Sequence, residues 1–174
     1  DNKMVFTFVT AYFKIYESDK FDFYFEQFKK LVSTGFPIIV FLDDTIDSKL
    51  LKFYNVKVIS ISYKSLPIND YIDNNAELPK NRNIEKDTIN FLKLMNSKTY
   101  FLRLAKNDIN SNGNNSNINT LIWIDFGIMK LCKDIEHFKK KLKILSTDKN
   151  LTKKILIPGG KNQKALLTTT EIYW

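Results

Sequence analysis

The sequence predicts an α/β fold in which a mostly parallel sheet is flanked by helices. Strand-like and helix-like segments alternate from residue 4 to residue 157, and the sequence contains no internal repeats. The strand-like segments are almost unbroken apolar runs, which is the pattern of strands buried on both faces. Alternation of this kind requires right-handed crossovers between parallel strands. The chain is long enough to bury a core without disulfides, and we expect residues 1–174 to form a single domain.

The first third of the chain supplies three of the predicted strands. Residues 4–12, "MVFTFVTAY", form the first strand, and the apolar face of residues 21–32 predicts a helix after it. Residues 36–44, "FPIIVFLDD", form a second buried strand that ends in two acids. A short helical segment at 47–54 then leads to a third strand at 56–62.

After a polar loop that contains two prolines, the remaining segments continue the alternation. Apolar residues at three- and four-residue steps predict one long helix over 84–105. The asparagine-rich stretch 107–119 is predicted to be a surface loop that leads into a buried strand at 121–124. A basic helix follows, and a last strand at 154–157 completes the predicted order.

Cysteine and histidine usage excludes several kinds of site. Cys132 is the only cysteine, so a disulfide framework and a cysteine-built zinc site are excluded. His137 is the only histidine, and a Ser-His-Asp triad would depend entirely on it. No apolar run is long enough to span a bilayer, and no signal segment opens the chain. We therefore expect a cytoplasmic or membrane-peripheral protein, and the first residue, Asp1, suggests a piece of a longer chain.

The formal net charge of +8 raises the possibility of nucleic-acid binding, since clustered cations release counterions from phosphate backbones. Nearly all the positive residues are lysines, with Arg82 and Arg103 the only arginines, and the chain is also rich in Asn and Ile. This bias is typical of an A/T-rich genome. The densest basic run, 137–143, lies on an amphipathic helix, where a solvated face is favoured over an anion-binding one. We expect no specific nucleic-acid partner.

Acidic residues follow two of the predicted strands, at Asp43 with Asp44 and at Asp125. Ligands of open α/β sheets bind outside the carboxyl ends of the strands, so these positions suggest phosphate or metal chemistry, although Asp125 also fits a loop cap before a Gly turn. The "DFG" at Asp125 resembles a kinase magnesium motif, but a glycine-rich loop and a His-Arg-Asp loop are missing. The scattered glycines also exclude a Rossmann fingerprint and a phosphate loop.

Four stretches in order along the chain carry a family resemblance: "TFVTAYF" at 7–13, "KDTINFLKLMNSKTYFL" at 86–102, "IWIDFGI" at 122–128 and "ILIPGG" at 155–160. Together they resemble the HtrL/YibB family, which is similar to glycosyltransferases of the GT-A, nucleotide-diphospho-sugar class. The resemblance implies a Rossmann-like GT-A fold. It also implies a nucleotide-sugar donor, such as a uridine diphosphate sugar, and a divalent cation, manganese or magnesium.

The same resemblance assigns Asp125 to the metal and diphosphate site. GT-A enzymes hold the metal with an Asp-x-Asp motif at the end of a central strand, because hard cations prefer oxygen ligands. Gly127 stands where the second Asp would be, which leaves one carboxylate to do the work of two. Arg103 and Lys98, on the preceding helix, could reach ribose or phosphate. For Lys98, simple solvation at the surface is the favoured alternative.

Further donor-binding residues follow from the resemblance. Thr10, Ala11 and Tyr12 would lie along the nucleotide, with the ring of Tyr12 offered to the base. Ordinary packing of Tyr12 is an equal alternative. Asp43 would accept a hydrogen bond from the base, or else would cap a helix that begins near residue 47.

The resemblance implies that the chain is a glycosyltransferase that moves a sugar from a nucleotide diphosphate to an acceptor hydroxyl. The chain stops at Trp174 after an aromatic stretch, and we expect it to be truncated on the acceptor side. The catalytic base is therefore unassigned, and the acceptor can be a glycan, a lipid or a protein. Two alternatives remain open: a non-catalytic GT-A-like binding module and a basic nucleic-acid-binding protein.

Overall fold

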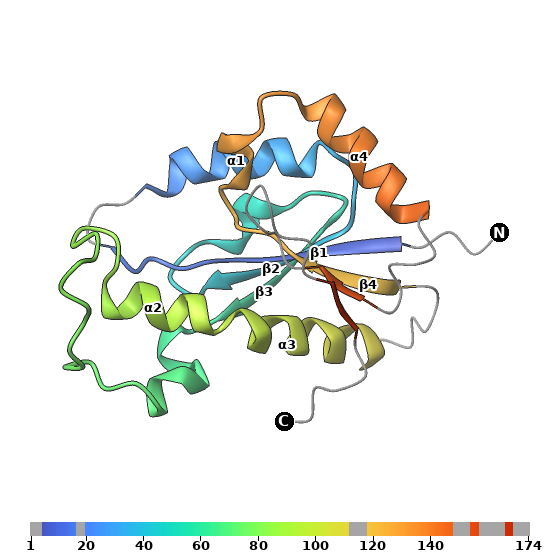
Figure 1. Ribbon diagram of the computed structural model, residues 1–174. Helices are drawn as coiled ribbons and strands as arrows, with labels where there is room; N and C mark the ends of the chain where they lie inside the picture. The colour runs from blue at the N-terminus through green and yellow to red at the C-terminus, as the bar shows by residue number, and fades with distance from the viewer. Residues whose placement is uncertain (1–4, 17–19, 112–117, 148–153, 157–165, 169–174) are drawn as a thin grey trace.

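Four parallel strands form the central sheet of this protein (Figure 1). A computed structural model describes residues 5–16, 20–111, 118–147, 154–156 and 166–168. The strands are β1 (Val5–Tyr12), β2 (Ile38–Asp43), β3 (Val56–Ile61) and β4 (Ile118–Trp123). Their order is β3-β2-β1-β4, and every neighbouring pair is parallel. The predicted α/β class with a parallel sheet is confirmed at this level.

The direction of winding reverses at β1. From β1 the chain moves outward through β2 to β3, and it then crosses back to place β4 on the other side of β1. All six residues of β2 are buried, as a strand covered on both faces requires. The carboxyl ends of β1 and β4 therefore flank a topological switch point, the place where open α/β sheets bind ligands.

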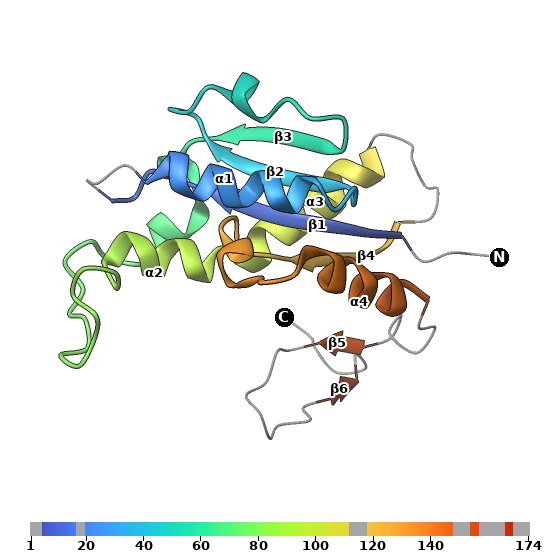
Figure 2. The same cartoon turned by 90° about the horizontal axis from the view of Figure 1, so that it is seen from above.

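Helices cover both faces of the sheet. Helices α1 (Phe21–Val32) and α4 (Ile135–Thr147) lie on one face, and α2 (Ile89–Asn96) and α3 (Lys98–Ser111) lie on the other (Figures 1 and 2). Alternate strand residues enter separate apolar cores, because successive side chains point to opposite faces. None of the helices among the described residues has the length and apolar character needed to cross a bilayer.

The single helix predicted over 84–105 is wrong, because two helices occupy this stretch. Helix α2 ends at Asn96, Ser97 interrupts, and α3 begins at Lys98 and continues to Ser111. The buried hydroxyl of Ser97 donates to the carbonyl of Lys93 (2.9 Å), a side-chain bond of the type that bends helices. The helix also takes up the start of the loop predicted over 107–119, of which residues 112–117 lie outside the described part of the chain.

The last predicted strand does not join the parallel sheet. Strand β5 (Lys154–Leu156) pairs antiparallel with β6 (Leu166–Thr168) in a separate two-stranded sheet. A short apolar run fits any sheet edge, so its sequence does not specify its partner. Residues 157–160, which end the quoted "ILIPGG" stretch, lie outside the described residues.

Short 3₁₀ helices make up much of the connections. The segment predicted as helical at 47–54 contains only one such turn, and the polar loop after β3 contains two more. These helices are η1 (Ser48–Leu51), η2 (Tyr63–Ser65), η3 (Pro67–Asp70) and η4 (Ile128–Leu131).

Candidate functional site at the carboxyl edge of the sheet

Asp125 stands just beyond the end of β4, at the switch point of the sheet. Ile124 N–H still donates to the carbonyl of Val9 on β1 (2.9 Å), so Asp125 is the first residue to leave the sheet. Its own carbonyl accepts from Ile128 N–H (2.9 Å), which turns the chain into η4. The Asp125 side chain is 58% exposed. The carboxylate is thus presented at the open edge of the sheet.

Two side chains hold one oxygen of this carboxylate. Lys98 Nζ (3.0 Å) and Trp123 Nε1 (2.9 Å) both donate to Oδ1 of Asp125. Lys98 Nζ also lies 5.4 Å from the centre of the Trp123 ring, in a cation–π contact. The expectation that Lys98 is simply solvated is therefore wrong. The second oxygen, Oδ2, has no hydrogen bond to any described residue.

The charges around Asp125 set its ionisation. Partial burial acts to raise the pKa of the carboxyl group, but the hydrogen bonds from Trp123 and Lys98 and the charges of Lys98 and Lys130 outweigh it. The pKa of Asp125 is lowered as a result. Two lysines around one carboxylate leave this group with an excess of positive charge, which suits an anionic ligand.

The position of a second acid is closed by an aromatic ring. A Cβ atom on Gly127 would lie 2.8 Å from Cε1 of Tyr24 and closer still to Cδ1. Lys130 Nζ lies 5.3 Å from the centre of the same ring. Among the described residues, no three His, Cys, Asp or Glu side chains gather as metal ligands. These residues do not fit a protein-built metal site, and within the group around Asp125 its Oδ2 is the oxygen left open to a cation.

Thr10, Ala11 and Tyr12 form the end of β1, beside Asp125, but their side chains differ in access. Thr10 is 0% exposed, so a nucleotide could touch only its backbone. The ring of Tyr12 packs against Phe21 (5.2 Å between centroids) and Phe126 (5.0 Å) in the α1 core. These contacts agree with the alternative that Tyr12 is an ordinary packing residue. The proposed nucleotide contacts of Thr10, Ala11 and Tyr12 stay predictions.

Asp43 is buried at the end of β2, with only 4% of its surface exposed. Its Oδ2 accepts from Lys14 N–H (3.0 Å), while Oδ1 accepts from the N–H (3.0 Å) and hydroxyl (2.8 Å) of Thr45. The helix-capping alternative is wrong, because Asp47 itself caps η1 by accepting from Lys49 N–H. Asp43 instead ties the end of β1 to the end of β2, and its contact with a base stays a prediction.

Arg103 is not brought to this group. Its guanidinium lies over the ring of Tyr100 (5.6 Å), on an exposed part of α3. Arg103 follows Lys98 by five positions, which places it ~7.5 Å further along the helix and on a different side. Of the two basic residues considered on this helix, Lys98 is the one that meets Asp125.

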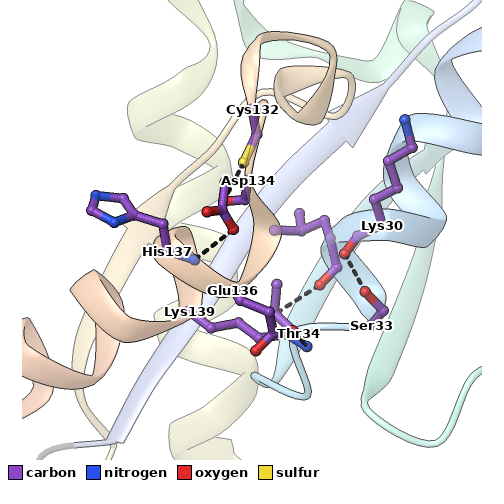
Figure 3. A network of polar contacts seen from close by, with 9 residues as sticks. Lys30, Ser33, Thr34, Cys132, Asp134, Glu136, His137 and Lys139 are labelled. Atoms are coloured by element: carbon purple, nitrogen blue, oxygen red, sulfur yellow. Dashed lines mark hydrogen bonds and ion pairs between the residues drawn. The ribbon is translucent and has the colours of Figure 1, made fainter.

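The only cysteine and the only histidine belong to a different region, at the start of α4 (Figure 3). Asp134 caps this helix: Oδ1 accepts from His137 N–H (2.9 Å), and its carbonyl accepts from the Cys132 thiol (3.3 Å). The imidazole of His137 points away from these contacts in Figure 3. The network is structural, and the triad left open on His137 finds no support in it.

Sequence reasoning missed Trp123 and Lys130. Trp123 precedes Asp125 by two residues and shares its side of the chain, a spacing that could have indicated the contact. Lys130 follows a turn, and no pattern in the sequence indicated its position.

Comparisons of the chain with protein-family models, with curated proteins and with solved structures find no match.

Proposed function

We propose that this chain binds a nucleotide-diphospho-sugar at the switch point between β1 and β4 and transfers the sugar to an acceptor hydroxyl. The observation that carries the proposal is the group formed by Asp125, Lys98 and Trp123 at this edge, with Lys130 close by. The resemblance to the HtrL/YibB family, and through it to GT-A glycosyltransferases, supports the choice of reaction.

The chemistry of sugar transfer fits the charges of this group. Negative charge builds on the diphosphate as the sugar leaves, and preorganised cations stabilise that charge. Lys98 and Lys130 supply positive charge, and the bond from Lys98 to Asp125 fixes the direction of its ammonium. The Trp123 ring, which stacks on Phe101, packs against the Lys98 ammonium and helps to hold it in place. A manganese or magnesium ion bound to the diphosphate would add further positive charge, with Asp125 Oδ2 as its protein ligand.

Trp123 provides a direct way to test donor binding. The chain has two tryptophans, so the Trp174→Phe variant leaves Trp123 as the only one. Its fluorescence is followed while uridine diphosphate glucose is added, once with MnCl₂ and once with EDTA. Thermal unfolding is measured in parallel, since a ligand at ~100 times its Kd adds ~2.7 kcal/mol of stability.

We expect a saturable change in Trp123 fluorescence and a higher unfolding temperature. Replacing Lys98 by Met should weaken binding roughly 10- to 100-fold, the range for a lost charge-assisted hydrogen bond. Lys106→Met is the matched control, because it removes the same charge from α3 about 12 Å further along the helix. The absence of any response to uridine, guanosine or cytidine diphosphate sugars, with or without manganese, would contradict the proposal.

The ring of Tyr24 over Gly127 favours a second candidate, a binding module without transferase activity. Such a module keeps donor binding but lacks the second carboxylate that GT-A enzymes use on the metal. The two candidates differ in the fate of the bound donor. Release of free uridine diphosphate in the presence of manganese supports the enzyme, and binding without any such release supports the module.

A further inference from the structure

A second site lies at the same end of the sheet, where the connection after β3 meets the start of α2. A cavity of about 690 Å³ opens there, between Tyr63 and Asn69 on one side and Thr88, Asn90 and Lys93 on the other. The Tyr63 hydroxyl donates across to Oδ1 of Asn90 (3.2 Å), which ties the two walls together. The volume is within the usual range for small-molecule pockets, ~300–1,000 Å³.

Lys93 is a buried cation in the wall of this cavity. Only 2% of its surface is exposed, and its Nζ donates to Oδ1 of Asn74 (2.7 Å). An ammonium group has three donors, so this single neutral acceptor leaves two of them without a partner among the described residues. No described carboxylate forms an ion pair with Lys93. A buried charge without a counter-charge is unfavourable, and an anion in the cavity would relieve it.

The first turn of α2 faces the same cavity. The Thr88 hydroxyl caps the helix by accepting from Phe91 N–H (3.2 Å). The N–H groups of Ile89 and Asn90 have no acceptor within the helix, and both residues line the cavity. The positive end of the helix dipole therefore adds to the charge of Lys93. Lys64 also lines the cavity, and its lining contains no Asp or Glu.

We propose that this cavity binds the phosphate group of a small polar molecule. Lys93 and the N–H groups of Ile89 and Asn90 can each donate to a different oxygen, and a phosphate offers three where a carboxylate offers two. The cavity is much larger than a phosphate group, and its amide and phenol side chains suit the hydroxyls of an attached sugar. The site is separate from the Asp125 group, and the inference does not depend on the function proposed for that group.

The test follows the backbone amides of Ile89 and Asn90 by ¹H–¹⁵N NMR. Inorganic phosphate, ribose 5-phosphate and ribose are titrated separately into the whole chain. We expect both phosphate compounds to shift these two amides in a saturable way, with ribose 5-phosphate binding more tightly, and ribose alone to leave them unchanged. Unchanged Ile89 and Asn90 amides in the phosphate titrations would overturn the proposal.

Substitutions then test the role of Lys93. Lys93→Met keeps most of the length of the side chain and removes its charge, and we expect phosphate affinity to fall roughly 10- to 100-fold. Asn74→Asp is an independent variant at an exposed position that neutralises Lys93 in place, and it should cause a similar loss. Lys106→Met is the matched control, because it removes an exposed lysine of α3 that does not line this cavity, and it should bind phosphate here normally.

The outcomes separate this site from the donor site. Normal phosphate affinity in Asn74→Asp, or a loss in Lys106→Met as large as that in Lys93→Met, would overturn the assignment. A chain that binds ribose 5-phosphate at Ile89 and Asn90 but ignores nucleotide sugars would retain this inference while losing the proposed function. Asn74→Asp also keeps the test decisive if Lys93→Met does not fold.

Discussion

The ends of β2 and β4 each carry an aspartate at the same edge of the sheet, yet the two residues do opposite things. Asp43 is 4% exposed, and the chain itself occupies both of its oxygens. Asp125 is 58% exposed at its side chain and keeps Oδ2 open. The position of an acid at a strand end is therefore not enough to make it a ligand-binding residue. The neighbouring backbone decides whether the carboxylate is used internally or offered to a ligand.

The difference follows from where the two strands lie in the sheet. Strand β2 lies between β1 and β3, so the chain leaving β1 passes over its end and donates Lys14 N–H to Asp43. Strand β4 is the outer strand of the four-stranded sheet, beyond β1. With a neighbour on one side only, its end is left open, and side chains rather than backbone groups reach Asp125.

Replacing Asp43 by Asn should give the largest effect of the three changes that test this comparison. The amide keeps one acceptor and turns a donor toward N–H groups, so at least one buried donor loses its partner. We expect the free energy of unfolding to fall by ~3 kcal/mol, since bonds to charged groups contribute ~1.5–3 kcal/mol each. Urea denaturation measures this change. A loss as small as that of Asp125→Asn would show that the two acids are equivalent after all.

Gly127→Asp should have the next largest effect, because it rebuilds the two-acid motif at the end of β4. The new side chain must displace the ring of Tyr24, and overpacking of this kind costs ~1–3 kcal/mol. Thermal unfolding measures the loss. Combining Gly127→Asp with Tyr24→Ala removes the clash, so the two losses should not add. Simple additivity in the double variant would mean that the ring does not close this position.

Asp125→Asn should have the smallest effect on stability, under ~1 kcal/mol, because the carboxylate in the ion pair with Lys98 is 58% exposed. The pKa of Asp125 is lowered in the folded chain, so its carboxylate stabilises the fold above the ordinary aspartate pKa of ~3.9. This contribution disappears as the pH falls through the lowered value.

The pH dependence of Asp125 can be followed by NMR titration of its carboxyl carbon and by unfolding at several pH values. The stability difference between the natural chain and Asp125→Asn should shrink in acid. Lys98→Met should raise the pKa of Asp125, because it removes one hydrogen bond and the nearest positive charge. An unchanged pKa in this variant would contradict the ion pair.

The parallel sheet could be predicted because strands buried on both faces must be continuous apolar runs. The ends of β2, whose residues are all buried, fall within two residues of their predicted positions for this reason. The ends of β3 are equally close, although this outer strand is only partly buried. The interruption at Ser97 could not be predicted, because the apolar residues keep their three- and four-residue spacing on both sides of a one-residue break. The pairing of β5 with β6 could not be predicted either, because the sequence of a three-residue strand does not specify which strand it pairs with.

The position of Asp125 at the carboxyl edge could be predicted from the apolar run that ends just before it. Its partner Lys98 could not, because the contact joins residues 27 positions apart and depends on how α3 packs against β4. The cavity at Lys93 gave no signal at all. Its lysine falls within an apolar helical pattern, where the sequence does not distinguish a buried cation from a solvated one.

The break at Ser97 separates the helix that carries Lys93 from the helix that carries Lys98. In one continuous helix, inserting or deleting a single residue rotates every later side chain by ~100° and would carry Lys93 and Lys98 out of register together. With Ser97 between them, we expect the turn to absorb such a change, because α3 packs on β1 and β4 while α2 packs on α3 and η3. We therefore expect a one-residue insertion in α2 to change the cavity while Lys98 keeps its contact with Asp125.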